Sequence, residues 1–184
     1  MATKLATQKS TTKPPAKPVM QIYRAINGKL EDEDPDAANI LPMSQETIDG
    51  FARLVDAGML DGNVVKTLID IPGFALTYCW FKPHFPLPRH SHKQDCLYYI
   101  VKGDIKLGTE RLGAGDGFFL PDGTPYTYDI LDDGVELLEF RTSSDSNFKA
   151  FNHTKKWWDK AEKACHDNRE AWKKAKPPRA ALTA

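Results

Sequence analysis

The sequence has 184 residues, of which 41% are apolar, and its 25 basic side chains balance its 25 acidic ones. This length suits one domain with extensions, and the zero net charge gives no sign of a nucleic-acid-binding surface. No apolar run approaches the roughly 18 residues of a membrane span, and no secretory apolar segment follows Met1. We therefore expect a cytoplasmic protein without membrane or nucleic-acid partners. The three cysteines are far apart in the chain, which argues against a disulfide framework and a structural zinc site.

The first 63 residues are expected to contribute a tail, one strand and one helix. Residues 1–18 are rich in Lys, Ser, Thr and Pro and contain no acid, a composition that predicts a disordered tail. Residues 19–63 predict an edge strand at Val19–Ile26 and a helix that is capped by Ser44 and closed by Gly58. We expect this helix to pack against the outside of a sheet. Its apolar stripe comprises Ile48, Phe51, Leu54 and Val55.

Residues 64–142 change to the period-two pattern of β-strands. Turns that contain Gly and Pro separate the segments about every ten residues, which is typical of an all-β sandwich or barrel. Within this region Gly103 is expected to lie in the turn of a hairpin. The expected strands are Val64–Asp70, Phe74–Phe81, Cys96–Val101, Ile105–Leu107, Phe118–Leu120, Tyr126–Leu131 and Val135–Arg141.

Residues 143–184 predict a helical extension and a short tail. The helix is expected over 154–176 and ends before Pro177 and Pro178. One side of it is apolar and is expected to cover the barrel or a neighbouring subunit. The net basic charge of the segment leaves an anionic partner as the alternative. The apolar side consists of Trp158, Ala161, Cys165 and Trp172.

The stretch 89–103 holds the most informative pattern. His90 and His92 are two residues apart and precede an apolar, aromatic run. In a strand, residues i and i+2 point the same way, so both imidazoles could meet at one ion of Zn, Fe, Mn, Cu or Ni. Two histidines alone do not make a metal site, so a His pair in a polar loop is the alternative.

The spacing around these histidines resembles the two motifs of the cupin family, over about residues 64–142. The first motif, G-x5-H-x-H-x3,4-E-x6-G, is matched at both histidines and at Gly103, with Cys96 at the position of the Glu. The second motif, G-x5-P-x-G-x2-H-x3-N, is matched at three positions, with Tyr126 at the position of the His. These three positions are Gly115, Pro121 and Gly123, while Ile130 replaces the Asn and His84 replaces the leading Gly of the first motif.

The resemblance implies a double-stranded β-helix, or cupin jelly roll, flanked by the two predicted helices and containing a metal site. His90 and His92 would be metal ligands. Cys96 and Tyr126 would complete the site, and they are also the candidate catalytic residues. A cysteine ligand would favour Zn or Cu. Three further residues are expected at the pocket, namely Asp95, Tyr98 and Tyr128, whereas His84 is expected outside it.

Small cupins similar to this chain include non-haem Fe(II) dioxygenases that act on acetylacetone or dihydroxyacetophenone. The resemblance therefore implies a metal-dependent enzyme, with an Fe(II) dioxygenase for a small keto, enol or phenolic substrate as the first interpretation. Open positions on the metal would bring the substrate and O2 together. The alternatives are a lyase or isomerase that uses Zn or Mn as a Lewis acid, and a non-catalytic module that binds a small ligand. The resemblance also implies a homodimer.

Overall fold

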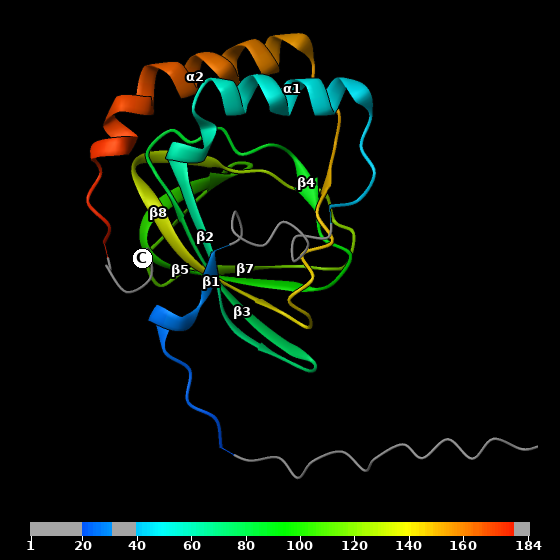
Figure 1. Cartoon of the computed structure of the whole chain (residues 1–184), viewed down its shortest axis with the longest axis vertical. Coiled ribbons are helices and arrows are strands. Elements are labelled where there is room, and N and C mark those ends of the chain that lie inside the picture. Colours follow the sequence, from blue (N-terminus) through cyan, green and yellow to red (C-terminus); the bar gives the residue numbers. More distant parts are fainter. Residues whose placement is uncertain (1–19, 31–39, 179–184) are drawn as a thin grey trace, which may run out of the picture.

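A seven-stranded antiparallel sheet, curled into a barrel, dominates the computed structural model of the chain (Figure 1). The structure describes residues 20–30 and 40–178, so the tail expected at 1–18 lies outside the described residues. The strands are β1 Lys29–Leu30, β2 Asn63–Ile71, β3 Phe74–Phe81, β4 His90–Ser91, β5 Cys96–Leu107, β6 Glu110–Gly113, β7 Gly117–Leu120, β8 Asp129–Arg141 and β9 Lys149–Ala150. The helices are α1 Gln45–Asp56 and α2 Lys155–Lys174, with 3-10 turns η1 at Ala25–Asn27 and η3 at Met59–Gly62.

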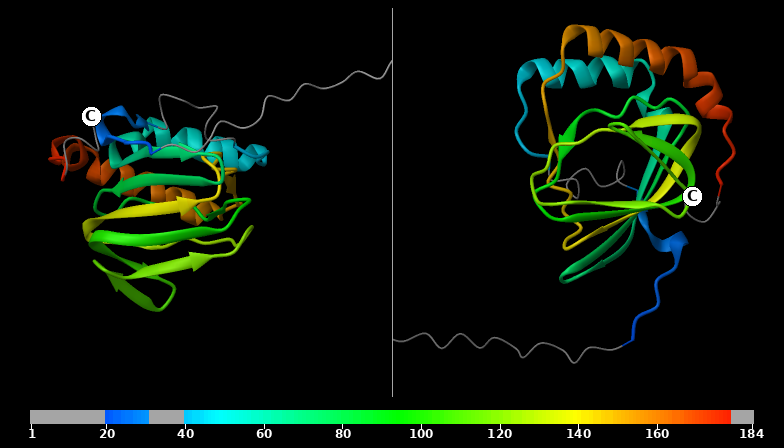
Figure 2. Two further views of the ribbon diagram at one scale, coloured as in Figure 1. Left: turned by 90° about the horizontal axis from the view of Figure 1, so that it is seen from below. Right: turned by 180° about the vertical axis from the view of Figure 1, so that it is seen from behind.

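The strands of the large sheet follow the order β1-β2-β3-β8-β5-β6, with β7 paired to β5, and a second sheet joins β4 to β9. The two helices lie side by side over one side of the barrel (Figures 1 and 2). The predicted all-β architecture with one N-terminal and one C-terminal helix is thus confirmed. None of the helices within the described residues is both long and apolar enough to cross a membrane.

Strand alternation separates the barrel interior from its outer face. In β5, Tyr98 and Ile100 are buried, whereas Leu97 is about half exposed. Leu137 of β8 is paired with Cys79 of β3 on one side and with Ile100 on the other. Because side chains alternate along β8, the residues at 139 and 141 face the interior together with Leu137.

The hairpin expected at Gly103 is wrong, because β5 runs through this residue without interruption. Gly103 has a φ of 74°, and a Cβ there would lie 1.9 Å from the carbonyl oxygen of Gly134. The glycine therefore permits a bulge and a close backbone approach to β8, not a turn. The chain reverses after Leu107, where β6 pairs back on β5. The two strands expected over 126–141 are likewise one strand, which begins at Asp129.

The edge strand expected at Val19–Ile26 is also wrong within the described residues. Residues 20–24 have no regular structure, η1 follows them, and β1 is the short strand that pairs with β2. The apolar residues of this segment do not enter the barrel, because Met20, Ile22 and Ile26 are all exposed.

Helix α1 begins at its predicted cap. The Ser44 side chain accepts a hydrogen bond from the Thr47 N–H, and Gly58 follows the helix with a φ of 97°. The buried face is narrower than the predicted stripe, because Ile48 and Val55 are exposed. The buried residues of α1 are Thr47, Gly50 and Leu54.

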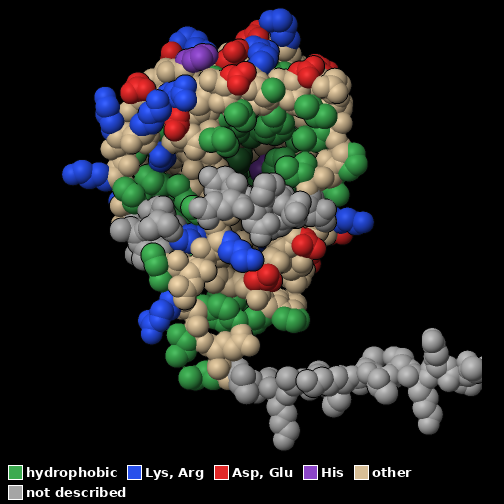
Figure 3. All heavy atoms as spheres, in the orientation of Figure 1, with side chains coloured by type: hydrophobic (Ala, Val, Ile, Leu, Met, Phe, Trp, Pro, Cys, Tyr) green, Lys and Arg blue, Asp and Glu red, His purple; other side chains and the backbone are tan. Residues whose placement is uncertain are grey.

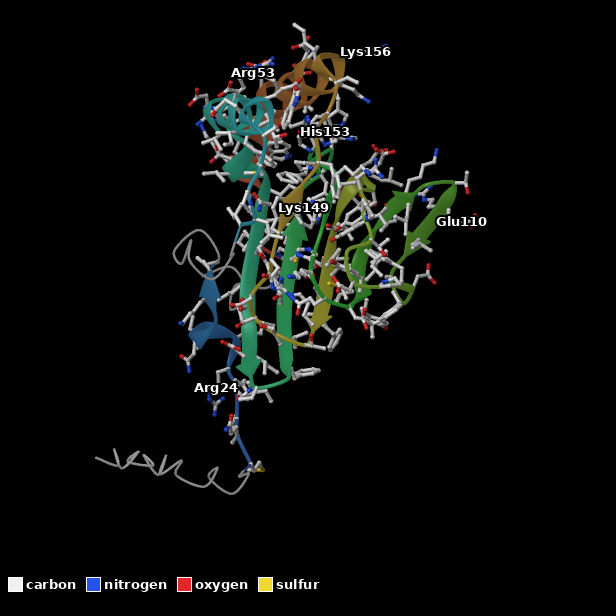
Figure 4. All side chains as sticks on the ribbon, turned by 90° about the vertical axis from the view of Figure 1, so that its right-hand side faces the viewer. Arg24, Arg53, Glu110, Lys149, His153 and Lys156 are labelled. Atoms are coloured by element: carbon white, nitrogen blue, oxygen red, sulfur yellow. The ribbon has the colours of Figure 1, made fainter. Side chains whose placement is uncertain are left out.

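The partner of α1 is α2 and not the outside of the sheet. Gly50 faces the indole of Trp158 so closely that a Cβ at Gly50 would lie 2.4 Å from the ring. Phe51 meets the same indole edge-on, with ring centroids 5.7 Å apart. Arg53 adds ion pairs with two acids of α2 (Figure 4), which are Asp159 and Glu162.

Helix α2 has the predicted apolar side, since Trp158, Ala161, Cys165 and Trp172 are all buried. Trp172 packs against Phe85, with ring centroids 6.1 Å apart, and its indole N–H donates to the Pro83 carbonyl at 2.9 Å. The helix therefore covers the barrel of its own chain. Trp172 makes that contact, whereas Trp158 packs on α1.

Candidate active-site cavity

The barrel interior holds a cavity of about 160 Å³. Strands β2, β3, β5 and β8, the turn η3, the loops around β4 and the Phe51 ring of α1 form its wall. Figure 3 shows the surface hollowed between apolar side chains, with a histidine visible inside the hollow. The polar side chains of the wall include His90, His92, Tyr98, Tyr126, Tyr128, Glu139 and Arg141.

Backbone pairing positions the two histidines. His90 pairs with Ala150 of β9 on one side and exchanges two backbone hydrogen bonds with Tyr126 on the other, at 2.9 and 3.0 Å. His92 lies against the same cavity, as strand alternation predicts, and the two imidazole centroids are 5.2 Å apart. Phe148 stacks on the His90 ring at 4.8 Å and helps to hold it in place.

The outer ring nitrogens set the tautomer of both histidines. His90 Nδ1 is 2.8 Å from the Pro88 carbonyl oxygen, and His92 Nδ1 is 2.6 Å from that of Ser146. A carbonyl oxygen only accepts, so each Nδ1 carries the proton and each Nε2 presents a lone pair. Burial, with His92 adding to it, lowers the pKa of His90 to about 4, and burial also lowers the pKa of His92. Both rings are therefore neutral at pH 7.

Two tyrosines connect His90 to Glu139. The Tyr126 hydroxyl is 2.8 Å from His90 Nε2 and 2.5 Å from the Tyr98 hydroxyl, which donates to Glu139 Oε1 at 2.8 Å. Burial and then the charge of Glu139 raise the pKa of both phenols well above the ordinary value. Each phenol therefore keeps one proton to donate.

This chain of groups has fewer protons than contacts. Its ends, His90 Nε2 and the Glu139 carboxylate, only accept, so two hydroxyl protons must serve three contacts. His92 Nε2 adds to the imbalance, because its lone pair lies 3.6 Å from Glu139 Oε1 and 3.4 Å from the Tyr126 hydroxyl. Acceptors that face each other in a buried site need a proton or a cation between them.

Glu139 and Arg141 bring opposite charges into the cavity. Burial by itself would raise the pKa of Glu139, but the Arg141 guanidinium and the hydrogen bond from Tyr98 outweigh it and lower the pKa below the ordinary value. Glu139 is thus ionised although it is buried. Arg141 Nε lies 3.8 Å from Glu139 Oε1, and Arg141 Nη2 donates to the Thr77 hydroxyl at 2.9 Å.

The structure brings Tyr98, Tyr126 and Tyr128 to the cavity with the two histidines, but Cys96 is not part of its wall. The Cys96 thiol donates to the Gln94 carbonyl at 3.6 Å. Burial, followed by the negative charge of Glu139, raises the pKa of Cys96 to about 12. The side chain is therefore a thiol in the metal-free protein, and it would have to lose its proton to bind a metal as the thiolate.

Asp95 does not face the cavity, which corrects the expectation that it lines the pocket. It is exposed, and its carboxylate accepts a hydrogen bond from the Asp122 N–H at 2.9 Å. The reason is the regular alternation at the start of β5: Gln94 and Cys96 are buried, so the side chain between them points outward. His84 is external as expected, since its side chain is half exposed.

Glu139 and Arg141 are site residues that the motif resemblance does not indicate, because both lie beyond the second motif. A signal for them exists in the strand pattern. Both charged residues share the strand face of buried Leu137. A charge on the buried face of a strand costs free energy, which makes it a marker of a functional site.

The donor atoms of the cavity fit a divalent metal ion if a tyrosine is counted among them. In the part of the chain that the structure describes, no three His, Cys, Asp or Glu side chains are grouped closely enough to hold a metal ion by themselves. The Tyr126 hydroxyl oxygen lies 2.8 Å from His90 Nε2 and 3.4 Å from His92 Nε2. His92 Nε2 in turn lies 3.6 Å from Glu139 Oε1. Ligands about 2.1 Å from one ion are roughly 3 Å from each other, so both this spacing and the surplus of acceptors suit a cation.

No protein-family model and no curated protein matches the sequence. Among solved structures, the polyketide cyclase RemF from Streptomyces resistomycificus is 17% identical, with 81% of this chain and 97% of that chain covered and a TM-score of 0.52. KdgF from Halomonas sp. is 20% identical, with 45% and 79% covered and a TM-score of 0.41. An RmlC-like cupin from Shewanella frigidimarina is 21% identical, with 45% and 78% covered and a TM-score of 0.42.

At these levels of identity the similarity concerns the fold. The chain has the jelly-roll fold that the two motifs imply, and it shares this fold with RemF. Its interior is a buried cavity in which two neutral imidazoles, neutral phenols, a carboxylate and a guanidinium face each other.

Proposed function

We propose that the protein is a metal-dependent enzyme for a small organic substrate, with the divalent ion held by His90, His92, Glu139 and the Tyr126 hydroxyl. The contact between Glu139 Oε1 and His92 Nε2 carries the proposal, because these two acceptors lie 3.6 Å apart in a buried cavity. A second observation supports it. Both Nδ1–H groups donate to backbone carbonyls, which is the way proteins orient metal-binding histidines.

Fe(II) is the metal that we propose first, because two histidines and one carboxylate form the ligand set of many non-haem Fe(II) oxygenases. When bound, the ion would supply Lewis acidity and open positions for a keto or enolate oxygen and for O2. The protein's own part is binding and orientation. The neutral Tyr126 and Tyr98 hydroxyls would donate hydrogen bonds to a developing oxyanion. Phe51 and Phe148 would exclude water and contact a keto, enol or phenolic substrate.

A lyase or isomerase that uses Zn or Mn is the second candidate, and the tyrosine pair favours it. Two hydrogen-bonded phenols that lead to Glu139 can deliver a proton to a substrate without any redox step. A non-catalytic module that binds a small ligand is the remaining alternative.

Glu139 takes the role of anionic ligand in this proposal in place of Cys96. The matched variants Glu139→Gln and Cys96→Ala separate the two assignments. We expect Glu139→Gln to lose most of its bound metal and Cys96→Ala to retain it. The reverse result would return the role to Cys96.

The main test is elemental analysis of protein purified anaerobically, without chelator and without a polyhistidine tag. We expect near-stoichiometric metal in the wild type and almost none in the His90→Ala, His92→Ala double variant. Bound iron with O2 uptake on addition of acetylacetone would support the dioxygenase. Bound zinc or manganese without O2 uptake would support the lyase or isomerase. A wild-type protein that binds no metal after incubation with Fe(II), Zn(II) or Mn(II) would contradict the proposal and favour the binding module.

We also propose a homodimer that pairs through residues 20–30. This segment exposes Met20, Ile22 and Ile26, whereas Trp158 and Trp172 of α2 are buried within their own chain. Light scattering at micromolar concentration should give the mass of two chains for the wild type. A triple Met20→Ser, Ile22→Ser, Ile26→Ser variant should give the mass of one. A monomeric wild type would contradict this proposal.

A further inference from the structure

Arg141 lies between two cavities. It lines the cavity that contains the histidines, and it also lines a second cavity of about 330 Å³, whose wall includes Tyr23, Lys29 and Thr77. Only 6% of Arg141 is exposed to solvent. A guanidinium at this junction can contact a ligand in either cavity. The hydrogen bonds that Arg141 already makes determine which groups such a ligand needs.

The guanidinium uses little of its capacity for hydrogen bonds. A guanidinium has five N–H donors, and the structure gives Arg141 one hydrogen bond, from Nη2 to the Thr77 hydroxyl. Its Nε is buried and has no partner among the described residues, since Glu139 Oε1 at 3.8 Å is too far for a hydrogen bond. A buried charge with unused donors is costly unless an anion completes its contacts.

The proposed metal ion would sharpen this demand. If Glu139 is a metal ligand, its charge is shared with the ion and compensates Arg141 less. Glu139 is the only carboxylate among the described residues that line this cavity. The cavity would then carry net positive charge from the ion and from Arg141, and an anionic substrate would balance it.

We propose that Arg141 anchors the carboxylate of the substrate, which is a small 2-oxo or enol acid whose keto end faces His90 and His92. This inference rests on the proposed function and narrows its substrate class to acids. Arginine suits the role because its planar fork binds a carboxylate through two parallel hydrogen bonds. Arg141 would thereby set the orientation of the substrate as well as its charge.

A matched pair of probes tests the anchor. Benzoylformate is a 2-oxo acid, and in 1-phenylpropane-1,2-dione an acetyl group replaces its carboxylate. Binding of each would be measured by anaerobic calorimetry to metal-loaded wild type, Arg141→Gln, Arg141→Lys and the control Arg111→Gln. Arg111 is an exposed arginine of β6 that pairs with Asp104. Bound metal and unfolding temperature are measured for each variant, so that a loss of metal or of folding is recognised.

The wild type and Arg111→Gln should bind benzoylformate at least tenfold more tightly than the dione. Arg141→Gln should lose this preference with its metal content unchanged, and Arg141→Lys should keep only part of it. If the Gln variant does not fold, the Lys variant decides. Equal affinity of the wild type for both probes, no binding of either, or an unchanged preference in the Arg141 variants would overturn the inference and leave the metal site untouched. If the wild type binds no metal but still prefers benzoylformate, and if Arg141→Gln loses this preference, the proposed function is overturned. The assignment of Arg141 as carboxylate anchor then stands.

Discussion

The barrel interior and the helix layer bury very different side chains. The interior cavity buries two histidines, two hydrogen-bonded phenols, a carboxylate and a guanidinium. The layer made by α1, η3 and α2 buries mainly apolar groups, with Leu54, Trp158 and Trp172 at its centre. One polar group that the helix layer buries, the Trp172 indole N–H, donates to the Pro83 carbonyl.

This difference indicates which region stabilises the fold and which region is suited to bind a ligand. Apolar burial contributes about 25 cal/mol for each Å² removed from water. Buried ion pairs and unsatisfied acceptors contribute little or are unfavourable. We therefore expect the helix layer to supply stability and the interior to lower it in return for ligand binding. Substitutions in the two regions should separate these contributions.

Trp172→Ala should produce the largest effect. Removing a buried tryptophan typically costs about 3–5 kcal/mol of unfolding free energy, because it leaves a cavity and an unmatched surface. Here the indole packs on Phe85 and donates to the Pro83 carbonyl. Urea unfolding measures the change, and the partly exposed Trp157 provides the control Trp157→Ala. Equal losses in the two variants would mean that the buried Trp172 contributes no more to stability than the partly exposed Trp157.

The buried pair of Glu139 and Arg141 in the interior should behave differently from Trp172, because removing both charges together should cost no unfolding free energy. In metal-free protein, Glu139→Met should destabilise the fold by about 3–5 kcal/mol, because it leaves Arg141 as an unpaired buried charge. The double variant Glu139→Met, Arg141→Met should recover this loss and be as stable as the wild type or more stable by about 1–4 kcal/mol. A double variant that remains as unstable as the single one would mean that the pair stabilises the fold, contrary to the comparison.

Two tryptophans of α2 offer a finer test of the helix layer. The Trp172 indole N–H donates at 2.9 Å, whereas the buried Trp158 N–H has no hydrogen-bond partner among the described residues. Both change to Phe with a similar loss of volume. We expect Trp172→Phe to cost about 1 kcal/mol more than Trp158→Phe, which is the usual net value of one hydrogen bond. Equal losses of unfolding free energy in the two variants would mean that the Trp158 N–H also has a hydrogen-bond partner in solution.

The smallest effect is the pH dependence of stability that comes from His153, which lies just before α2 (Figure 4). Its imidazole stacks on the Trp157 indole. Its Nε2 accepts a hydrogen bond from the Arg89 N–H at 2.9 Å. Burial, with Arg89 adding to it, lowers the pKa of His153 below its ordinary value. The folded state thus prefers the neutral ring, so this stability is complete above the unfolded pKa of about 6.5 and is lost as the pH falls through the lower folded pKa.

His153→Gln removes this titration while keeping an oxygen that can accept from Arg89. The difference in unfolding free energy between wild type and His153→Gln should shrink from pH 7.5 to pH 5. The exposed His166 of the same helix provides the control variant His166→Gln. A constant difference across this range would contradict the assignment of a neutral His153.

The errors in the predicted elements have a common cause. Gly103 looks like a turn because glycine favours turns, but its positive φ is used for a bulge against the Gly134 backbone. The approach of these two segments is a tertiary contact that no local pattern contains. The same holds for α1, where Ile48 and Val55 continue an apolar stripe but α2 covers only the neighbouring face.

The sequence by itself determined the elements and contacts that depend on near neighbours. The Ser44 cap, strands β2, β3 and β7 and the common cavity of His90 and His92 follow from capping and from strand alternation. Only the tertiary structure decided what these histidines face. Glu139 meets Tyr98, which is 41 residues earlier in the chain, because β8 pairs with β5 in one register. Asp95 is turned away by the same alternation that turns Tyr98 inward, so the carboxylate of the cavity comes from a distant strand and not from the motif.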